Sequence, residues 1–224
     1  QYTMEKFKEG HTGKNFVVEK PKFDFDKPVF KKKLDLPKAS EIPIAREYLE
    51  RRRVDPEKFY FADKFKQWVN TQKQTFNTIT RDESRIIIPM YDKDSNLIGF
   101  QGRALGPSPN KYITVMLSDD APKIYGLEKV DSSKSIYIVE GPFDSTFIKN
   151  AVAMCGSDVD IRSFNWSNYI YVFDNEPRNR EIVNRISKTI NRGDKVIIWP
   201  TSIQQKDIND MVLAGLNVMD VLKS

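Results

Sequence analysis

Four acidic side chains in the second half of the chain could together hold a metal ion: Glu140, Asp174, Glu176 and Asp207. Carboxylates that converge on one place repel one another, which raises their pKa values unless a cation neutralises them. The chain has one cysteine and one histidine, so a metal that prefers sulfur or nitrogen lacks a ligand set here. Carboxylate oxygens suit a hard ion, and the pattern therefore favours Mg²⁺ or Mn²⁺.

The acids follow apolar segments that are typical of buried parallel strands. Residues 136–139 are β-branched or aromatic, and Glu140 comes directly after them, before a Gly-Pro pair that allows a turn into a helix. Asp174 and Glu176 come directly after a second such segment, 169–173. In an extended chain residues i and i+2 face the same side, so these two acids are expected to point the same way. Open α/β sheets bind ligands at the carboxyl ends of their strands. If the two strands are neighbours, the three acids converge.

Each carboxylate by itself also has a structural explanation. Asp174, Glu176 and Asp207 each precede a predicted helix, where an acidic side chain caps free backbone N–H groups. Glu140 alone could simply end a strand at the surface. Three acids at matching strand ends favour a metal site over this alternative.

The elements that position the acids alternate between strands and helices over residues 133–224. Strands are expected at 135–139, 151–155, 169–173 and 195–199, with helices at 143–150, 160–166 and 177–192. This alternation predicts a three-layer α/β domain with a parallel sheet and right-handed crossovers. The longest helix is expected to bury Ile182, Val183, Ile186 and Ile190. Cys155 is expected to be a buried, inert thiol.

Residues 40–132 predict a smaller α+β subdomain. The expected elements are a helix from Ser40 to Arg53, a helical stretch over 56–71, a hairpin of strands 85–91 and 97–103, and a strand over 111–116. Ser40 is expected to cap the first helix, which should bury Ile44, Tyr48 and Leu49. Pro89 places the first hairpin strand at an edge or a bulge.

The positive charge is concentrated in the first part of the chain. The net charge is +5 in total, and residues 133–224 carry equal numbers of acidic and basic side chains. A basic part that binds a polyanion, joined to a neutral part for chemistry, explains this distribution, and so do ordinary solubilising lysines. Residues 1–39 are rich in lysine and proline and predict a basic tether. Residues 51–53 are three arginines. Their positive charges would stabilise the C-terminal end of a helix and would equally well bind phosphates.

Taken together, the motifs resemble the TOPRIM domain of DNA primases. That domain has Glu-Gly after its first strand, Asp-x-Asp/Glu after its third, and a Lys-Asp motif like 206–210 after its fourth. The preceding region resembles the catalytic core of bacterial replicative primases, and the primases of T-even-type bacteriophages in particular. The resemblance rests there on the Arg-led hairpin 85–103, on Lys111-Tyr112 and on Lys123 before Tyr-Gly-Leu. It covers about residues 40–215.

The resemblance implies template-directed synthesis of RNA primers on single-stranded DNA from ribonucleoside triphosphates. Asp174 and Glu176, joined by Asp207, would hold Mg²⁺ or Mn²⁺, and Glu140 would act as acid/base or as a second metal ligand. Basic residues would hold phosphates or the template: Arg85, Arg103, Lys111, Lys123 and Lys206. Surface salt bridging is their structural alternative.

Further expectations follow from the same resemblance. They are a replicative helicase as partner, single-stranded-DNA-binding protein as a further candidate partner, a place in the cytoplasm of the infected host, and zinc only in an upstream module that this stretch lacks. No apolar run is long enough for a membrane span. The rival interpretations are a TOPRIM nuclease or topoisomerase, and a catalytically silent TOPRIM-like module that binds nucleic acid or helicase. The presence of Glu140, Asp174 and Glu176 favours an enzyme.

Overall fold

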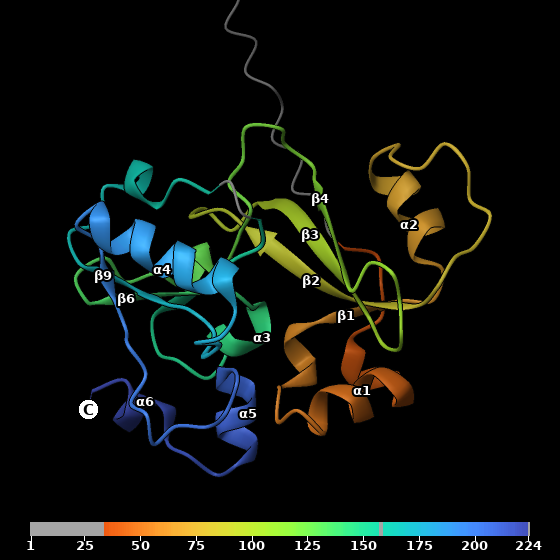
Figure 1. Cartoon of the computed structure of the whole chain (residues 1–224). Helices are drawn as coiled ribbons and strands as arrows, with labels where there is room; N and C mark the ends of the chain where they lie inside the picture. The colour runs from red at the N-terminus through yellow and green to blue at the C-terminus, as the bar shows by residue number, and fades with distance from the viewer. Residues whose placement is uncertain (1–33, 157–158, 224) are drawn as a thin grey trace, which may run out of the picture. The chain divides into compact units, whose positions relative to one another are not determined.

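Two neighbouring parallel strands, β6 (Ile136–Val139) and β8 (Tyr169–Val172), form the centre of the larger sheet. The computed structural model describes residues 34–156 and 159–223, all of which belong to one compact unit, Lys31–Ser224 (Figure 1). Residues 1–33 of the predicted tether, which include His11, lie outside the described residues. Because β6 and β8 are neighbours, the condition for Glu140 and Asp174 to lie close together is met.

The larger sheet has five strands in the order β5-β7-β6-β8-β9. Its other strands are β5 (Ile124–Tyr125), β7 (Ala151–Met154) and β9 (Lys195–Val196). All neighbours are parallel except β5, which pairs antiparallel with β7. The predicted parallel sheet is confirmed, and it takes one edge strand from before residue 133.

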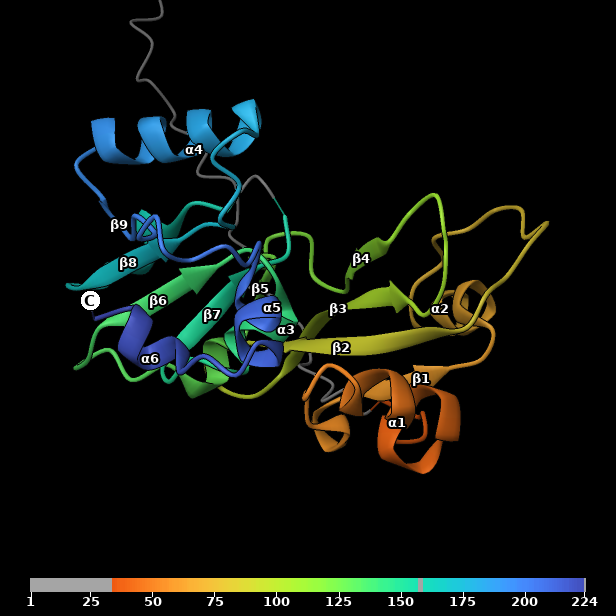
Figure 2. The same ribbon diagram turned by 60° about the horizontal axis from the view of Figure 1, so that its bottom comes forward.

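Helices cover both faces of this sheet, which gives the predicted three layers. Ile136, Ile138 and Tyr171 face α4 (Arg180–Asn191), whose Ile182 packs in the same core. Val139 and Val172 face the opposite way, because side chains alternate along a strand. Figure 2 shows α4 on one side of the sheet and the remaining helices on the other. These are α3 (Pro142–Ser145), α5 (Ile208–Leu213) and α6 (Val218–Val221).

The preceding part of the chain forms an antiparallel sheet in the order β1-β2-β3-β4. Its strands are β1 (Tyr60–Ala62), β2 (Arg85–Tyr91), β3 (Leu97–Ala104) and β4 (Tyr112–Met116). One face packs on α1 (Pro43–Glu50), in a core that also contains Val139 and Val172 of the larger sheet. The other face packs on α2 (Phe65–Gln72). The two sheets therefore share one hydrophobic core.

Local patterns were misleading in the first hundred residues. The expected helical stretch over 56–71 is interrupted by β1, which pairs with residues 85–87, so that α2 begins only at Phe65. Ser40 lies in a 3-10 turn (Ala39–Glu41), and α1 begins after Ile42 without a side-chain cap. Ile44 is 57% exposed, while Ala45 takes the buried position beside Tyr48 and Leu49. The hairpin of β2 and β3 and the strand β4 are confirmed.

The helical segments that follow the strands of the larger sheet are shorter than expected. The segment 160–166 contains only a 3-10 turn (Ile161–Phe164), and α4 starts at Arg180 because Asn179 caps it. On α4, Val183 and Ile190 are exposed, so the predicted buried face was too wide. Two further 3-10 turns complete the described elements, Pro56–Lys58 and Leu127–Lys129. Among the described helices, none has the length and apolar character needed to span a bilayer.

Candidate active site

Glu140 and Asp174 lie next to each other at the carboxyl ends of β6 and β8. Val139 and Val172 are partners in the parallel register, and the next turns bring the backbone N–H of Asp174 to Glu140 Oε2 at 3.1 Å. The other carboxylate oxygen of Glu140, Oε1, accepts from Arg185 of α4, whose guanidinium lies 5.2 Å from the ring centroid of Phe173. Both oxygens of Glu140 are therefore held.

Asp144 is a further acid at this place, one helical turn beyond Glu140. The pKa of Asp144 is raised to about 7 by burial and by the charge of Asp207, and the backbone N–H of Asn209, which donates at 2.9 Å, opposes this rise. Asp144 was not among the site residues predicted from the sequence. The available signal was its position in the first turn of a helix that follows directly from Glu140.

The Asp174 carboxyl experiences the same crowding. The pKa of Asp174 is raised to about 7, first by burial and then by the charges of Glu140, Asp144 and Asp207, while the charge of Lys206 opposes the rise. Two half-buried carboxyls with pKa values raised in this way indicate a place where negative charge is not yet balanced. We name the four residues Glu140, Asp144, Asp174 and Asp207 the acid cluster.

Glu176 differs from the expectation. The backbone N–H of Glu176 donates to the carbonyl of Asp174 at 2.9 Å, which closes a tight turn in place of the extended geometry that the i, i+2 argument assumed. Its side chain contacts Lys206 Nζ at 3.2 Å and accepts from Asn179. Asp207 caps α5 by accepting from the N–H of Asp210 at 2.7 Å, which is the structural role that the sequence analysis considered.

The acids do not form a finished metal site. Among residues 34–156 and 159–223, no three acidic, histidine or cysteine side chains stand close enough together to hold a metal ion. Instead of a metal ion, Arg185 pairs with Glu140 and Lys206 pairs with Glu176. Within the described residues, Glu140, Asp174 and Glu176 therefore do not come close enough to hold an ion together, and their assignment as metal ligands stays a prediction. The donor set nevertheless fits a hard divalent cation, because it consists of carboxylate oxygens whose mutual repulsion a cation would relieve.

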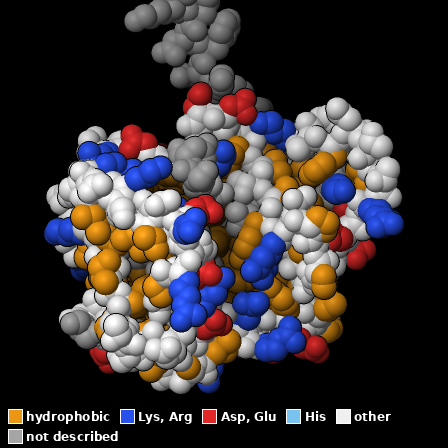
Figure 3. Space-filling view, viewed as in Figure 1, with side chains coloured by type: hydrophobic (Ala, Val, Ile, Leu, Met, Phe, Trp, Pro, Cys, Tyr) orange, Lys and Arg blue, Asp and Glu red, His pale blue; other side chains and the backbone are white. Residues whose placement is uncertain are grey.

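Several basic side chains lie beside the acid cluster. Desolvation lowers the pKa of Lys111, and the positive charges of Arg103, Arg52 and Lys206 lower it further, against the charge of Asp207. Figure 3 shows Lys and Arg side chains gathered near the middle of this face, with acidic side chains among them. We name Arg52, Arg103, Lys111 and Lys206 the basic cluster. Arg52 was not singled out as a site residue.

The basic residues of the prediction differ in their exposure. Arg103 is buried, donates from Nε to the Tyr48 hydroxyl at 3.0 Å and lies 4.6 Å from the ring centroid of Tyr112. Lys111 is exposed. Lys123 lines a cavity of about 250 Å³ away from the acid cluster, together with Asp119 and Asp120. The structure thus brings together Arg103, Lys111 and Lys206 of the five predicted basic residues.

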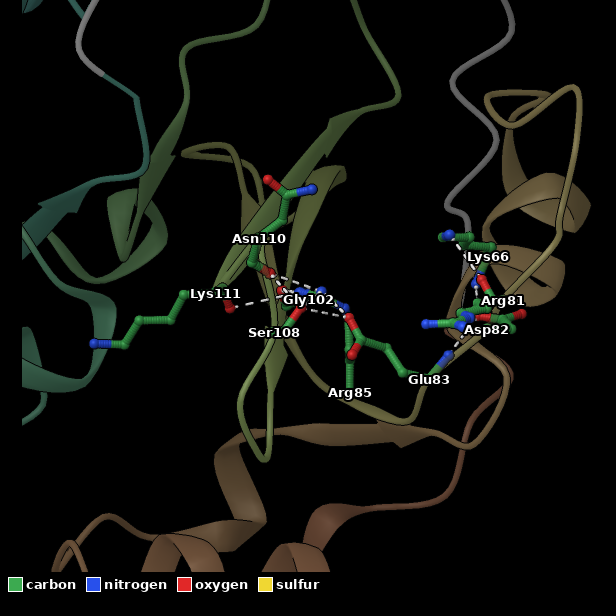
Figure 4. A network of polar contacts seen from close by, with 9 residues as sticks. All are labelled: Lys66, Arg81, Asp82, Glu83, Arg85, Gly102, Ser108, Asn110 and Lys111. Atoms are coloured by element: carbon green, nitrogen blue, oxygen red, sulfur yellow. Dashed lines mark hydrogen bonds and ion pairs between the residues drawn. The ribbon is translucent and has the colours of Figure 1, made fainter.

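Arg85 is part of the protein interior. Its side chain is 1% exposed, and its guanidinium donates to the carbonyls of Gly102 at 2.8 Å and Asn110 at 2.7 Å, and also to Glu83 (Figure 4). Figure 4 shows the Lys111 side chain pointing away from this network. These contacts favour a structural role for Arg85, which fixes the loop before Lys111, over the predicted contact with phosphate or template.

Replacing Arg85 by methionine is therefore expected to destabilise the fold by about 3 kcal/mol, because buried carbonyls and Glu83 lose their donor. Urea denaturation measures this change. Arg81→Met, at an exposed position in the segment before β2, should stay within about 0.5 kcal/mol of the parent chain. An Arg85→Met chain of unchanged stability with weakened DNA binding would contradict the structural role.

Comparison with known proteins identifies the fold. No protein-family model matches the chain. The DNA primase of Enterobacteria phage T4 is 33% identical over 213 residues, which cover 89% of this chain and 62% of that primase. The chain resembles DNA primases. This chain thus spans less than two thirds of the curated relative that it matches.

Solved structures agree with this resemblance. The DnaG catalytic core matches with a TM-score of 0.62 at 21% identity, covering 84% of this chain and 75% of that chain. The DnaG primase catalytic domain bound to single-stranded DNA matches with a TM-score of 0.60 at 21% identity, covering 84% and 74%. The fold is that of a primase catalytic core with its TOPRIM sheet. The predicted resemblance to primases of the T-even phage type is confirmed.

Proposed function

We propose that this chain is the RNA-polymerising core of a DNA primase, which synthesises short RNA primers on single-stranded DNA for replication. The observation that carries the proposal is the acid cluster at the ends of β6 and β8, beside the basic cluster. The phage T4 relative and the DnaG fold support the same function. The helicase and single-stranded-DNA-binding protein as partners, and the cytoplasm of an infected host as location, belong to this proposal.

The reaction that we propose is nucleotidyl transfer. A 3′-hydroxyl oxygen attacks the α-phosphorus of a ribonucleoside triphosphate, a new P–O bond forms, and pyrophosphate leaves. Asp144 and Asp174, with Glu140 and Asp207, would hold Mg²⁺ or Mn²⁺, and the bound ion would offset the negative charge of the phosphates. Glu176 would join them if Lys206 moves to the triphosphate.

The basic cluster has two tasks in this proposal. Lys111 and Lys206 attract the triphosphate and the template backbone, since both are polyanions. Arg103 cannot reach far, because it is buried against Tyr48 and Tyr112, and it keeps Tyr112 in place. Single-stranded DNA is present on a relative of the same fold, the DnaG catalytic domain, which supports a template on this chain.

The test is an incubation with single-stranded templates, labelled ribonucleotides and Mg²⁺, with and without the helicase. Short labelled RNA that depends on template and on Mg²⁺ is the expected product. A chain that binds template but makes no RNA under any of these conditions would contradict the proposal.

A silent TOPRIM-like module is a second candidate, and one observation favours it. Arg185 and Lys206 already pair with Glu140 and Glu176, as they would in a site where basic side chains replace the metal. Calorimetric titration with Mn²⁺ separates the two functions. A primase core binds the ion in competition with these pairs, whereas a silent module gives no metal-dependent heat.

Salt dependence tests the basic cluster. We expect Lys111→Ala to weaken binding of single-stranded DNA and to reduce the slope of log K against log salt by about 0.7, because one phosphate contact is lost. Fluorescence anisotropy over a series of salt concentrations measures the slope. Lys134→Ala, which removes an exposed lysine paired with Asp131, should leave it unchanged. Equal slopes for both variants would remove Lys111 from the template contact.

A further inference from the structure

A small cavity adjoins the acid cluster on the side of β3 and β4. It has a volume of about 250 Å³, and its lining includes Gln101, Tyr112, Glu140, Gly141 and Arg185. This volume is below the range of roughly 300–1,000 Å³ for pockets that take a drug-sized ligand. The cavity therefore suits one part of a nucleotide, such as its sugar, rather than the whole molecule.

The hydrogen bonds of β4 fix the orientation of the Gln101 side-chain amide. Gln101 and Thr114 are partners in the antiparallel register, and Gln101 Nε2 donates to Thr114 Oγ1 at 2.9 Å. The Thr114 hydroxyl donates its single hydrogen to the carbonyl of Cys155 at 3.2 Å. Thr114 can therefore only accept from Gln101, so the amide nitrogen faces Thr114 and Oε1 faces elsewhere.

The Gln101 Oε1 atom lacks a donor. Gln101 is 5% exposed, and within residues 34–156 and 159–223 its Oε1 has no hydrogen-bond partner. An unpaired buried acceptor is destabilising, and native proteins rarely keep one without a reason. Because the residue lines the cavity beside Glu140, a donor on a molecule bound there would satisfy the atom.

We propose that Gln101 Oε1 accepts a hydrogen bond from a ribose hydroxyl of the ribonucleotide bound at the acid cluster. The inference rests on the proposed function, since phosphates held near Glu140 place the attached sugar in the adjoining cavity. A ribose hydroxyl can donate, and a missing hydroxyl leaves the buried acceptor unpaired. Gln101 is thus a specificity residue that discriminates ribonucleotides from deoxyribonucleotides.

The experiment measures the affinity of the whole chain for three nucleotides in Mg²⁺ by calorimetry: ATP, 2′-deoxyATP and 3′-deoxyATP. The parent chain should bind ATP about tenfold more tightly than one of the two analogues, which identifies the hydroxyl. Gln101→Met, of similar shape, should bind ATP only as tightly as that analogue. Thr114→Val, which releases the amide to rotate, should reduce the discrimination in part.

Thermal unfolding verifies that both variants fold, and Gln101→Met should not melt below the parent, because it removes an unpaired polar atom. Equal affinity of the parent chain for all three nucleotides would overturn the inference, as would unchanged discrimination in Gln101→Met. Either result together with normal primer synthesis overturns this inference alone. A parent chain that binds no nucleotide and makes no primer overturns the proposed function as well.

Discussion

Replacing Asp174 by asparagine should lower primer synthesis by a factor of about a hundred or more. Asparagine keeps the shape of the side chain but removes the negative charge that Glu140, Asp144 and Asp207 already repel. That charge is useful only if a cation and phosphates come to it, and losses of this size are typical when one charge-stabilising group is removed from an active site. Labelled-primer yield in Mg²⁺ measures the effect.

The control for this prediction is Asp220→Asn, at an exposed position on α6. It should leave the primer yield unchanged. Binding of single-stranded DNA should survive in Asp174→Asn, because the basic cluster is intact. An Asp174→Asn chain with full primer yield would remove Asp174 from the chemistry.

Asp144→Asn should raise the stability of the folded chain in the absence of metal. The Asp144 pKa is about 7 in the folded chain and about 3.9 in an unfolded one, so the folded state keeps a proton that the unfolded state has released. The contribution of Asp144 to stability is therefore most favourable below about pH 4 and is lost as the pH rises to about 7. Removing the carboxyl removes this loss, and we expect a gain on the order of 2 kcal/mol at pH 8.

Urea denaturation in EDTA at pH 8 and pH 5 tests this prediction, and the gain should be less than half as large at pH 5. Added Mg²⁺ should stabilise the parent chain by mass action and the Asp144→Asn chain much less. Asparagine can still accept the N–H of Asn209, so that contact does not explain a gain. A loss of stability at pH 8 would show that Asp144 is a structural carboxylate whose charge the fold requires.

The sequence predicted the larger sheet well because its signals are local. Runs such as 136–139 and 169–173 lack polar residues, which is what burial on both faces of a parallel strand demands, and an acid directly after such a run lies at the carboxyl end. Neighbouring positions of β6 and β8 then bring Glu140 and Asp174 together. The position of each of these two acids at the end of a strand could therefore be predicted from the residues next to it.

The failures arise where distant contacts decide. Tyr60–Ala62 became a strand because residues 85–87 offer a partner, and nothing within 56–71 indicates that. Arg85 is buried because carbonyls more than fifteen residues away satisfy its guanidinium. Arg185 comes from a helix whose apolar pattern shows only which side faces the sheet, and its pairing with Glu140 is a property of the folded chain.

In the proposed function, the acid cluster binds a divalent cation where primer synthesis takes place. Crystals of this chain grown with Mn²⁺ and a ribonucleoside triphosphate test it most directly, through anomalous diffraction from manganese. We expect a manganese peak coordinated by Asp174 and at least one of Glu140 and Asp144, with Glu140 released from Arg185 and the triphosphate bound to the ion. A triphosphate bound without manganese at these carboxylates, or a Glu140–Arg185 pair that persists beside an empty acid cluster, would contradict it.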